Sequence, residues 1–400
     1  MKKVYDSIHG FIHFNELEGL LIDSLPFQRL RCIHQLGITN QVYPGATHTR
    51  FEHSLGVMHL AAAIFDHIFR EFPLKDKEYA RQMVRLGALS HDLGHLPFSH
   101  VSEKALLGKE GHEKWTLNII KSSYLLPVWE AISKEFPGKD VEADVIKLSI
   151  GEDKLKELDL LEKYPFTPME RVLSRLVSGD FFGADRMDYL LRDSKCTGVA
   201  YGFFDYHQLI EMLRILPVEN GLELGIEENG IESCEALLLA RMFMHKRVYQ
   251  YSSVKSYSFH LARFMKAVYD NVLTKSIDAY LSYSDHEVLT EMRRATKDSA
   301  HPGHFDALAV LAKGKRFKAL AFTGSIEEKH LEELTIPKGH MAWELSKNCK
   351  GKKGLSFPVI TANETIIPGS KLSEIEIPSG SPHWIYIDPT HEKLLLEILS

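Results

Sequence analysis

The sequence predicts a mainly α-helical protein, with a helical core over residues 1–275 and a smaller α+β C-terminal region over residues 276–400. Three observations lead to this prediction. Apolar residues recur at helical spacing through most of the first part of the chain. Capping and helix-breaking residues stand at the ends of these stretches. Beyond residue 275 the apolar runs become short and strand-like, with glycine and lysine clusters between them.

The opening fifty residues are mixed in character. Residues 8–14 alternate like a strand around Gly10, which predicts a short hairpin. A helix is then expected to begin near Pro26, because proline suits the first turn, and to end at Gly37. A turn at residues 44–45 leads into the next helix.

Strongly helical patterns follow. Over residues 54–72 the apolar side chains that would share a helix face are Leu55, Met58, Ala62, Phe65 and Phe69. A second helix is expected over residues 78–91 and a third from residue 111, with short helices across residues 125–165.

The same signals predict the elements after residue 165. Residues 167–170, Thr-Pro-Met-Glu, form a capping box with proline at the first helical position, and the next helix is expected from Ala184. Residues 215–218 and 221–226 alternate like the strands of a hairpin. One long helix is expected from Ser233 to about Leu273.

The C-terminal region is expected to hold two helices, at residues 285–297 and 304–313. Its expected strands are the short apolar runs 319–322, 357–360, 375–377 and 384–387. We expect this region to serve in oligomerisation or regulation.

The stretch from His91 to His100 carries three histidines and an aspartate in ten residues. The adjacent His91 and Asp92 offer a neutral nitrogen ligand beside an anionic oxygen ligand, which suits a borderline divalent cation. Two ligands make an incomplete site, and His53 and Asp185, each at the start of a predicted helix, are the candidates to complete it. The set predicts a site for Mn, Mg, Fe, Zn or Ni, with positions left for water and phosphate oxygens.

Three further histidines, His95, His100 and His112, are too many for one metal shell. Imidazole titrates near neutral pH, so these side chains suit proton transfer at a phosphate, and Glu103 and Glu113 could orient them. The alternative is that they support the metal ligands by hydrogen bonding.

Basic and aromatic side chains near these motifs suit a nucleotide. Arginine presents a fork of donors that matches phosphate oxygens, and tyrosine can stack on a base. The candidates are Arg50, Arg186, Arg241, Lys246, Tyr189, Tyr249 and Gln250. The alternatives are ion pairs of Arg50 or Arg186 with Glu52 or Asp188, and a core position for Tyr249.

The sequence around these residues resembles the HD superfamily of metal-dependent phosphohydrolases. It is similar in particular to the deoxynucleoside triphosphate (dNTP) triphosphohydrolases, which include the mammalian enzyme with SAM and HD domains and its bacterial relatives. The resemblance covers about residues 4–270. Its blocks are Phe27-Gln28-Arg29-Leu30-Arg31, Gln35-Leu36-Gly37, Tyr43-Pro44-Gly45-Ala46, Arg50 to Val57, His91 to His100, Ala184 to Tyr189 and His245 to Gln250.

The resemblance implies an HD-domain helical core and assigns roles to these residues. The implied metal ligands are His53, His91, Asp92 and Asp185. The implied catalytic residues, acting at the α-phosphate, are His95, His100, His112 and Glu113, with His112 and Glu113 as a pair. The implied substrate contacts are Gln35, Leu36, Arg50, Arg186, Tyr189, Asp193, Arg241, Tyr249 and Gln250.

The resemblance also implies regulation and assembly. Asp23, Gln28 and Arg31 match part of an activator-nucleotide pocket, so allosteric control is expected; the alternative is plain helix surface or a subunit interface. A homodimer or homotetramer is expected, with dNTPs as substrate and as activator.

The leading functional prediction is hydrolysis of a dNTP to deoxynucleoside and triphosphate. One alternative is another HD-type phosphohydrolase acting on nucleoside monophosphates, ribonucleotides or phosphodiesters. A second alternative, from another class, is a nucleotide-sensing scaffold with little catalysis.

Composition limits the remaining possibilities. A formal net charge of −6 argues against a nucleic-acid binder with a broad basic surface. The four cysteines are far apart and form no CxxC motif, which argues against a cysteine zinc site. Since the N-terminal residues lack an apolar signal core, and no apolar run is long enough to span a bilayer, a cytoplasmic protein without a membrane partner is expected.

Overall fold

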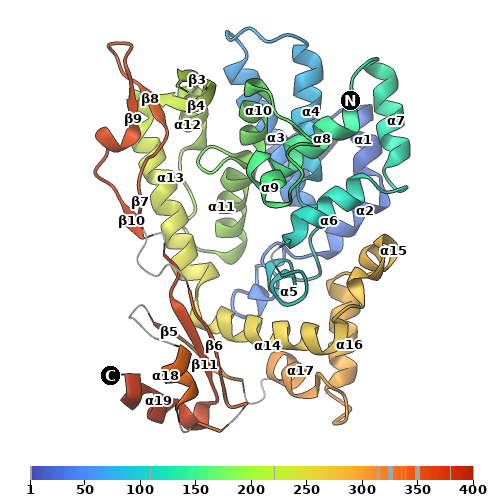
Figure 1. Ribbon diagram of the computed structural model, residues 1–400, viewed down its shortest axis with the longest axis vertical. Coiled ribbons are helices and arrows are strands. Elements are labelled where there is room, and N and C mark those ends of the chain that lie inside the picture. Colours follow the sequence, from blue (N-terminus) through green and yellow to red (C-terminus); the bar gives the residue numbers. More distant parts are fainter. Residues whose placement is uncertain are drawn as a thin grey trace.

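The computed structural model describes residues 2–108, 110–219, 221–312, 316–322, 328–334, 336–337, 339–346, 352–378 and 380–399. As predicted, the fold is mainly α-helical, and most strands lie in the C-terminal part of the chain, on one side of the helical core (Figure 1). Among the residues described, no helix combines the length and apolar character needed to cross a bilayer.

The helices of the first half form most of the helical core, and the metal-motif loop, residues 91–99, runs between α4 and α5. They are α1 (Glu16–Ile22), α2 (Leu25–Arg29), α3 (Arg50–Ile68), α4 (Lys77–Ser90), α5 (His100–Leu106), α6 (Gly111–Ile120), α7 (Leu126–Glu135), α8 (Val141–Ile150), α9 (Glu152–Glu157), α10 (Pro168–Ser178) and α11 (Ala184–Thr197).

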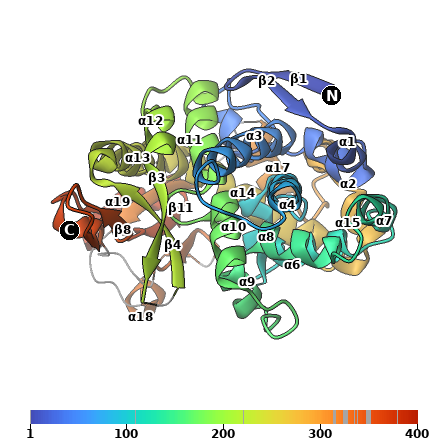
Figure 2. The same ribbon diagram turned by 90° about the horizontal axis from the view of Figure 1, so that it is seen from above.

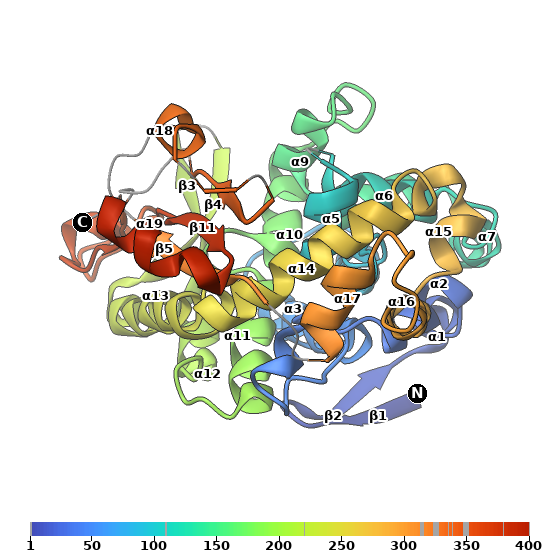
Figure 3. The same ribbon diagram turned by 90° about the horizontal axis from the view of Figure 1, so that it is seen from below.

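The later helices link this core to the C-terminal region. They are α12 (Tyr206–Met212), α13 (Ile231–Met244), α14 (Ser252–Tyr269), α15 (Ile277–Leu281), α16 (Asp285–Ala295), α17 (His304–Leu311), α18 (Glu328–Glu332) and α19 (Glu392–Leu399). Helix α14 packs against α5, α17 and strand β5, and so joins the two parts of the molecule (Figure 3).

The strands form small sheets. They are β1 (Lys2–Asp6), β2 (Gly10–Phe14), β3 (Leu213–Val218), β4 (Gly221–Glu227), β5 (Lys318–Phe322), β6 (Met341–Glu344), β7 (Lys352–Lys353), β8 (Pro358–Ile360), β9 (Ile366–Pro368), β10 (Ile377–Pro378) and β11 (His383–Ile387). The sheet orders are β1-β2, β10-β7, β5-β11-β6 and β3-β4-β8-β9. The β1-β2 hairpin lies along one edge of the molecule, beside α3 (Figure 2).

Several predicted elements are confirmed. The capping box of Thr167 and Glu170 starts α10, with proline in the first turn. The predicted hairpin is the β3-β4 pair, with Leu213 opposite Ile226. The helix predicted to start at residue 54 begins four residues earlier, because Thr49 and Glu52 form a second capping box.

Two predicted helices are wrong in extent. The helix from Pro26 gives way to a 3-10 turn and ends at Cys32, because Ile33 is extended and its carbonyl accepts a hydrogen bond from the Arg50 N–H (3.0 Å). The long helix expected from Ser233 is two helices, with a π-helical turn at His245–Tyr249 and a break after it. At that break the Gln250 side chain accepts a hydrogen bond from Trp384 Nε1 (3.1 Å), a contact that local sequence does not reveal.

One hydrophobic core runs through most of the chain. It includes residues of α3 and α4 together with Tyr280, Val288 and Val359 from beyond residue 275. Strand β8 also continues the β3-β4 hairpin as a parallel neighbour of β4. Two small clusters lie apart from this core around β11, one containing Trp384 and the other Ile385. Much of the C-terminal region therefore packs as part of the helical core, and the division at residue 275 stays a prediction.

Candidate metal centre

Three helices bring the predicted metal ligands to one point. His53 lies in the first turn of α3, His91 and Asp92 follow α4, and Asp185 lies in the first turn of α11. The ligand atoms of His53, His91 and Asp185 lie within 4.8 Å of one another. Asp92 joins them, with its Oδ1 3.3 Å from His91 Nε2 and its Oδ2 3.7 Å from His53 Nε2.

The histidine hydrogen bonds fit a divalent metal. His91 Nδ1–H donates to the Ala88 carbonyl (2.7 Å), which leaves the lone pair of its buried Nε2 without a hydrogen bond to any described residue. His53 Nδ1 bonds Asp188 Oδ2 (2.7 Å), and its Nε2 lies 3.0 Å from Asp185 Oδ1. A histidine held at one ring nitrogen by a carboxylate or carbonyl, with the other nitrogen facing a site, is the usual arrangement of a metal ligand.

The electrostatics also suit a cation. Burial alone would raise the pKa of the Asp185 carboxyl, but His53 and His91 hold it below its usual range. Burial opposes charge on His53, yet its contacts with Asp185 and Asp188 raise its pKa to about 10. The surrounding carboxylates thus favour positive charge at this point, which a bound cation would also supply.

Glycine lets α3 and α11 approach this closely. A Cβ on Gly56 would lie 1.9 Å from Asp188 Oδ1 and 2.6 Å from Arg192 Nη2. Asp188 in turn bonds Arg192, which also pairs with Asp6 of β1 at 2.8 Å. A buried network of charges thus fixes the carboxylate that orients His53.

Arg50 belongs to the same centre. Its buried guanidinium donates to Asp92 Oδ2 (2.5 Å) and to Ser99 Oγ (2.8 Å). Burial would raise the pKa of Asp92, but Arg50 and the nearby histidines hold it well below its usual range. Arg50 therefore keeps a predicted metal ligand ionised, whereas the ion pair with Glu52 considered from the sequence is replaced by one with Asp92.

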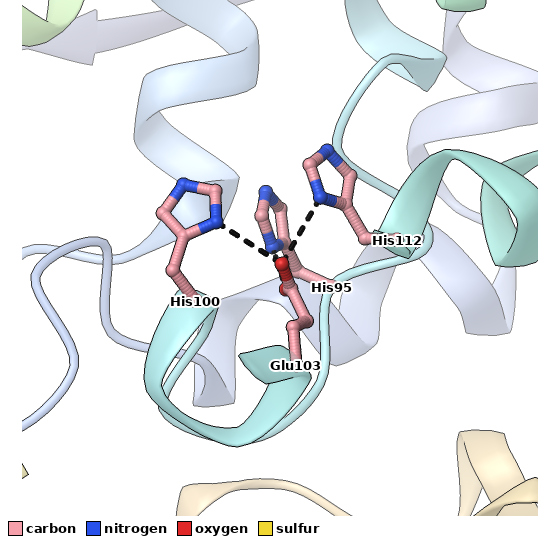
Figure 4. A group of neighbouring side chains, drawn as sticks. All are labelled: His95, His100, Glu103 and His112. Carbon is pink, nitrogen blue, oxygen red and sulfur yellow. Dashed lines mark hydrogen bonds and ion pairs between the residues drawn. The ribbon is translucent and has the colours of Figure 1, made fainter. Parts of the chain in front are cut away.

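A second cluster adjoins the first. Figure 4 shows His95, His100 and His112 directed at one carboxylate, that of Glu103. Nδ1 of His95 bonds Glu103 Oε1, while Nδ1 of His100 and of His112 lie 3.0 and 3.1 Å from its Oε2. The His95 and His112 rings stack with centroids 3.7 Å apart.

Glu103 sets the charge of this cluster. Burial opposes ionisation of Glu103, but His95 and His112 hold its pKa well below the usual range. Burial likewise opposes charge on His112, and Glu103 outweighs it and raises the pKa of that imidazole. Glu113 lies farther off, with Oε2 3.8 Å from His112 Nδ1, so Glu103 is the nearer partner. His95 Nε2 links the two clusters through Asp92 Oδ1 (3.1 Å).

A cavity of about 860 Å³ opens onto both clusters. The sequence-predicted residues among its lining are Gln35, Leu36, Arg50, His91, Asp92, His95, His100, His112, Glu113, Asp185, Tyr189, Asp193 and Tyr249. Gln35 Oε1 is buried without a hydrogen-bond partner in the described part of the chain. A cavity of this volume is typical of a small-molecule site.

Four predicted substrate residues lie outside the described lining of the cavity: Arg186, Arg241, Lys246 and Gln250. Arg186 Nη2 forms an ion pair with Asp180 Oδ1 at 3.4 Å. The ion pair of the alternative interpretation is therefore made with Asp180 and not with Asp188. Arg241 lies near Arg186 and Tyr189, and burial lowers its pKa. Gln250 bonds Trp384 of the C-terminal sheet.

The predicted activator residues lie together on α2 and the turns beside it. Arg31 Nε donates to Gln28 Oε1 (2.8 Å), and its guanidinium lies 3.4 Å from the centre of the Phe51 ring. Asp23 is exposed and 3.4 Å from Lys2 Nζ. None of the three is among the residues that line the cavity in the described structure.

Sequence reasoning missed several functional contacts. His9 from the N-terminal hairpin bonds Asp188 Oδ1 (2.7 Å), and His48 bonds Asp193 Oδ1 (2.7 Å). Tyr249 donates to the other oxygen of Asp193 (2.7 Å). Asp188 could have been found, since it shares a helix face with Asp185. His9 stands in a turn and His48 in an irregular segment, and neither carries a local signal.

The His48–Asp193 pair predicts a pH-dependent stability. Burial disfavours the charged ring, but contacts with Asp193 and Cys196 raise the pKa of His48 from 6.5 to about 9. The pair therefore stabilises the fold fully below about pH 6.5 and loses this contribution as the pH rises through 9. The difference in Tm between wild type and His48→Gln is expected to be largest near pH 6 and to shrink toward pH 10. A difference that grows with pH would contradict this assignment.

Comparison with known proteins places the chain in a family. The HD domain profile matches residues 50–174 and the HD associated region matches residues 204–305. An uncharacterized protein of Methanocaldococcus jannaschii is 34% identical over 284 residues, 70% of this chain and 51% of that one. Human deoxynucleoside triphosphate triphosphohydrolase SAMHD1 is 33% identical over 265 residues, 63% of this chain and 42% of that one.

A solved structure agrees over the whole length. The crystal structure of a hypothetical protein from Aquifex aeolicus is 31% identical, with a TM-score of 0.77, and the match covers 100% of both chains. The chain spans about half the length of the curated relatives it matches. From its helical core, its His-Asp motif and these matches, the chain belongs to the HD-domain family.

Proposed function

We propose that the protein is a metal-dependent dNTP triphosphohydrolase, which converts a dNTP and water to deoxynucleoside and triphosphate. The observation that carries the proposal is the single cavity onto which both the metal-ligand set and the Glu103-linked histidine cluster open. Similarity to the human, chicken and bovine dNTP triphosphohydrolases supports the choice of substrate.

His53, His91, Asp92 and Asp185 would hold the metal. When bound, a divalent cation supplies a Lewis acid for a phosphoryl oxygen and lowers the pKa of water. Arg50 keeps Asp92 charged and oriented for this role. Asp188 keeps His53 oriented in the same way.

His112 is the proposed general acid. Its Nδ1 is occupied by Glu103, so its Nε2–H remains to donate a proton to the leaving 5′-oxygen. Glu103 raises its pKa, which favours the protonated form that this role requires.

The Asp193–Tyr249 pair and Gln35 are the proposed nucleoside contacts. Tyr249 and Asp193 are hydrogen-bonded to each other and line the cavity, where they can bond the 3′-hydroxyl of the deoxyribose. Gln35 Oε1 has no partner among the described residues and can accept from a base.

A product assay tests the proposal. The purified protein is incubated with each of the four dNTPs and with Mn or Mg, and the products are resolved by ion exchange. Equal amounts of deoxynucleoside and triphosphate are expected. Release of orthophosphate or pyrophosphate without triphosphate would overturn the proposal.

The same assay separates the alternatives. Equal turnover of ribonucleotides would favour another phosphohydrolase of this family, and metal binding without turnover would favour a nucleotide sensor. Repeating the assay with a second nucleotide, and with Arg31→Ala, tests the proposed activator site. The oligomeric state is measured by light scattering in both conditions.

A further inference from the structure

The turn between α15 and α16 lies directly against the metal-motif loop, although it belongs to the C-terminal region. The Tyr280 hydroxyl donates to the Gly94 carbonyl, and the Tyr280 ring stacks on Trp115 with centroids 3.9 Å apart. Arg29 bridges the same two segments, donating to the Tyr283 carbonyl and to the His95 carbonyl, each at 2.9 Å.

Asp285, the first residue of α16, makes the most direct link. Its side chain is fully buried, and both oxygens accept hydrogen bonds. Oδ1 accepts from the Phe98 N–H (2.7 Å). Oδ2 accepts from the His34 N–H (3.0 Å) and contacts His34 Nδ1 (2.6 Å). One carboxylate therefore ties together two loops that lie 64 residues apart in sequence.

Both loops lead to the metal centre. Phe98 and Ser99 have φ angles of 58° and 54°, which are unfavourable for residues with a side chain and need support from their surroundings. Ser99 Oγ donates to the His34 carbonyl (3.0 Å) and accepts from Arg50 Nε (2.8 Å). Arg50 then donates to Asp92 Oδ2.

The other loop forms the cavity wall. Gln35 and Leu36 follow His34 directly and line the cavity. The Gln35 N–H donates to the His48 carbonyl (3.0 Å), so this part of the wall is held between His48 and the preceding residue, His34, which Asp285 binds.

We propose that Asp285 is a positioning residue of the active site, acting through His34 and Ser99 on Arg50 and Asp92. The C-terminal region thereby takes part in arranging the reactive centre. This inference rests on the proposed function in one respect, namely that the metal centre is the site of catalysis.

Asp285→Asn tests the proposal, because the amide keeps the volume but cannot accept at both ends. Asp306→Asn is the matched control. Asp306 is a buried carboxylate of the same region, hydrogen-bonded to His260 Nδ1 (2.7 Å) and to Arg263. It is not among the described residues that line the cavity. Both variants are expected to lower Tm.

Only Asp285→Asn is expected to lower kcat, roughly ten- to a hundredfold, with metal content unchanged, since small displacements at a reacting centre have effects of this size. It is also expected to speed amide hydrogen exchange in residues 33–37 and 96–101, which Asp306→Asn leaves as in wild type. Identical kcat and exchange in the two variants would overturn the proposal. If the wild type turns over no dNTP, the proposed function fails, but the exchange comparison still decides the role of Asp285.

Ser99→Ala provides an independent variant if Asp285→Asn does not fold. It removes the hydrogen bonds of Ser99 Oγ with His34 and Arg50 but leaves those of Asp285 intact, so a lower kcat at near wild-type Tm is expected. In the double variant, kcat is expected to fall little beyond the Asp285→Asn value, because both changes act through one path. A wild-type kcat in Ser99→Ala, or fully multiplicative losses in the double variant, would contradict the proposal.

Discussion

His91→Ala is expected to abolish metal binding and to lower turnover by at least about a thousandfold. His91 Nε2 is buried, faces Asp92 and Asp185, and makes no hydrogen bond within the described structure. Its loss therefore removes a proposed metal ligand without breaking a structural hydrogen bond at that atom. A metal contributes several kcal/mol to a phosphoryl transition state, and each 1.36 kcal/mol is a factor of about ten in rate. Metal content after dialysis and kcat on the best dNTP measure the two effects.

His112→Ala is the matched comparison, because it removes a histidine of the same cavity that belongs to the second cluster. It is expected to retain bound metal and to lower kcat by about a hundredfold or more, the usual effect of losing a general acid. Loss of metal in His112→Ala, or retained metal in His91→Ala, would contradict the division into a metal site and a proton-transfer cluster.

Gly56→Ala is expected to have the largest effect on stability. The added methyl would lie 1.9 Å from Asp188 Oδ1, so α3 and α11 must separate or the buried pair of Asp188 and Arg192 must break. Disrupting such a pair or overfilling a packed interface costs about 3 kcal/mol or more. Because Asp188 orients His53, metal affinity is expected to fall as well, by about ten- to a hundredfold. Urea unfolding and metal titration measure the two losses.

Gly19→Ala is the control for this change. Gly19 is also inside a helix, α1, but a Cβ there would meet its nearest neighbour, Lys2 Nζ, at 3.6 Å. Alanine is favoured over glycine in helices by about 1 kcal/mol, so this variant is expected to be as stable as wild type or more stable. Wild-type metal affinity in Gly56→Ala would refute the link between helix approach and ligand orientation.

Much of the helical fold can be predicted from the sequence because its signals are local. The capping box at Thr167 and the apolar stripe around Leu55 depend on residues three or four apart, and both mark helices in the structure. Helix ends set by distant partners are missed. The chain leaves its helix at Ile33 to pair with Arg50, and it breaks near Gln250 where Trp384 approaches from the C-terminal sheet.

The sequence by itself determined the family of this protein and the residue types and motif spacing of its candidate metal site. Tertiary structure alone decided how these side chains are oriented and which of them are charged. Of Glu103 and Glu113, which the sequence suggested as partners of the histidines, the structure makes Glu103 the carboxylate that all three share. It also ties Arg50 to Asp92, and it places Asp285 against the loop that carries Ser99. Ligand type is a property of single residues, whereas orientation and charge depend on neighbours that only folding brings within hydrogen-bonding distance.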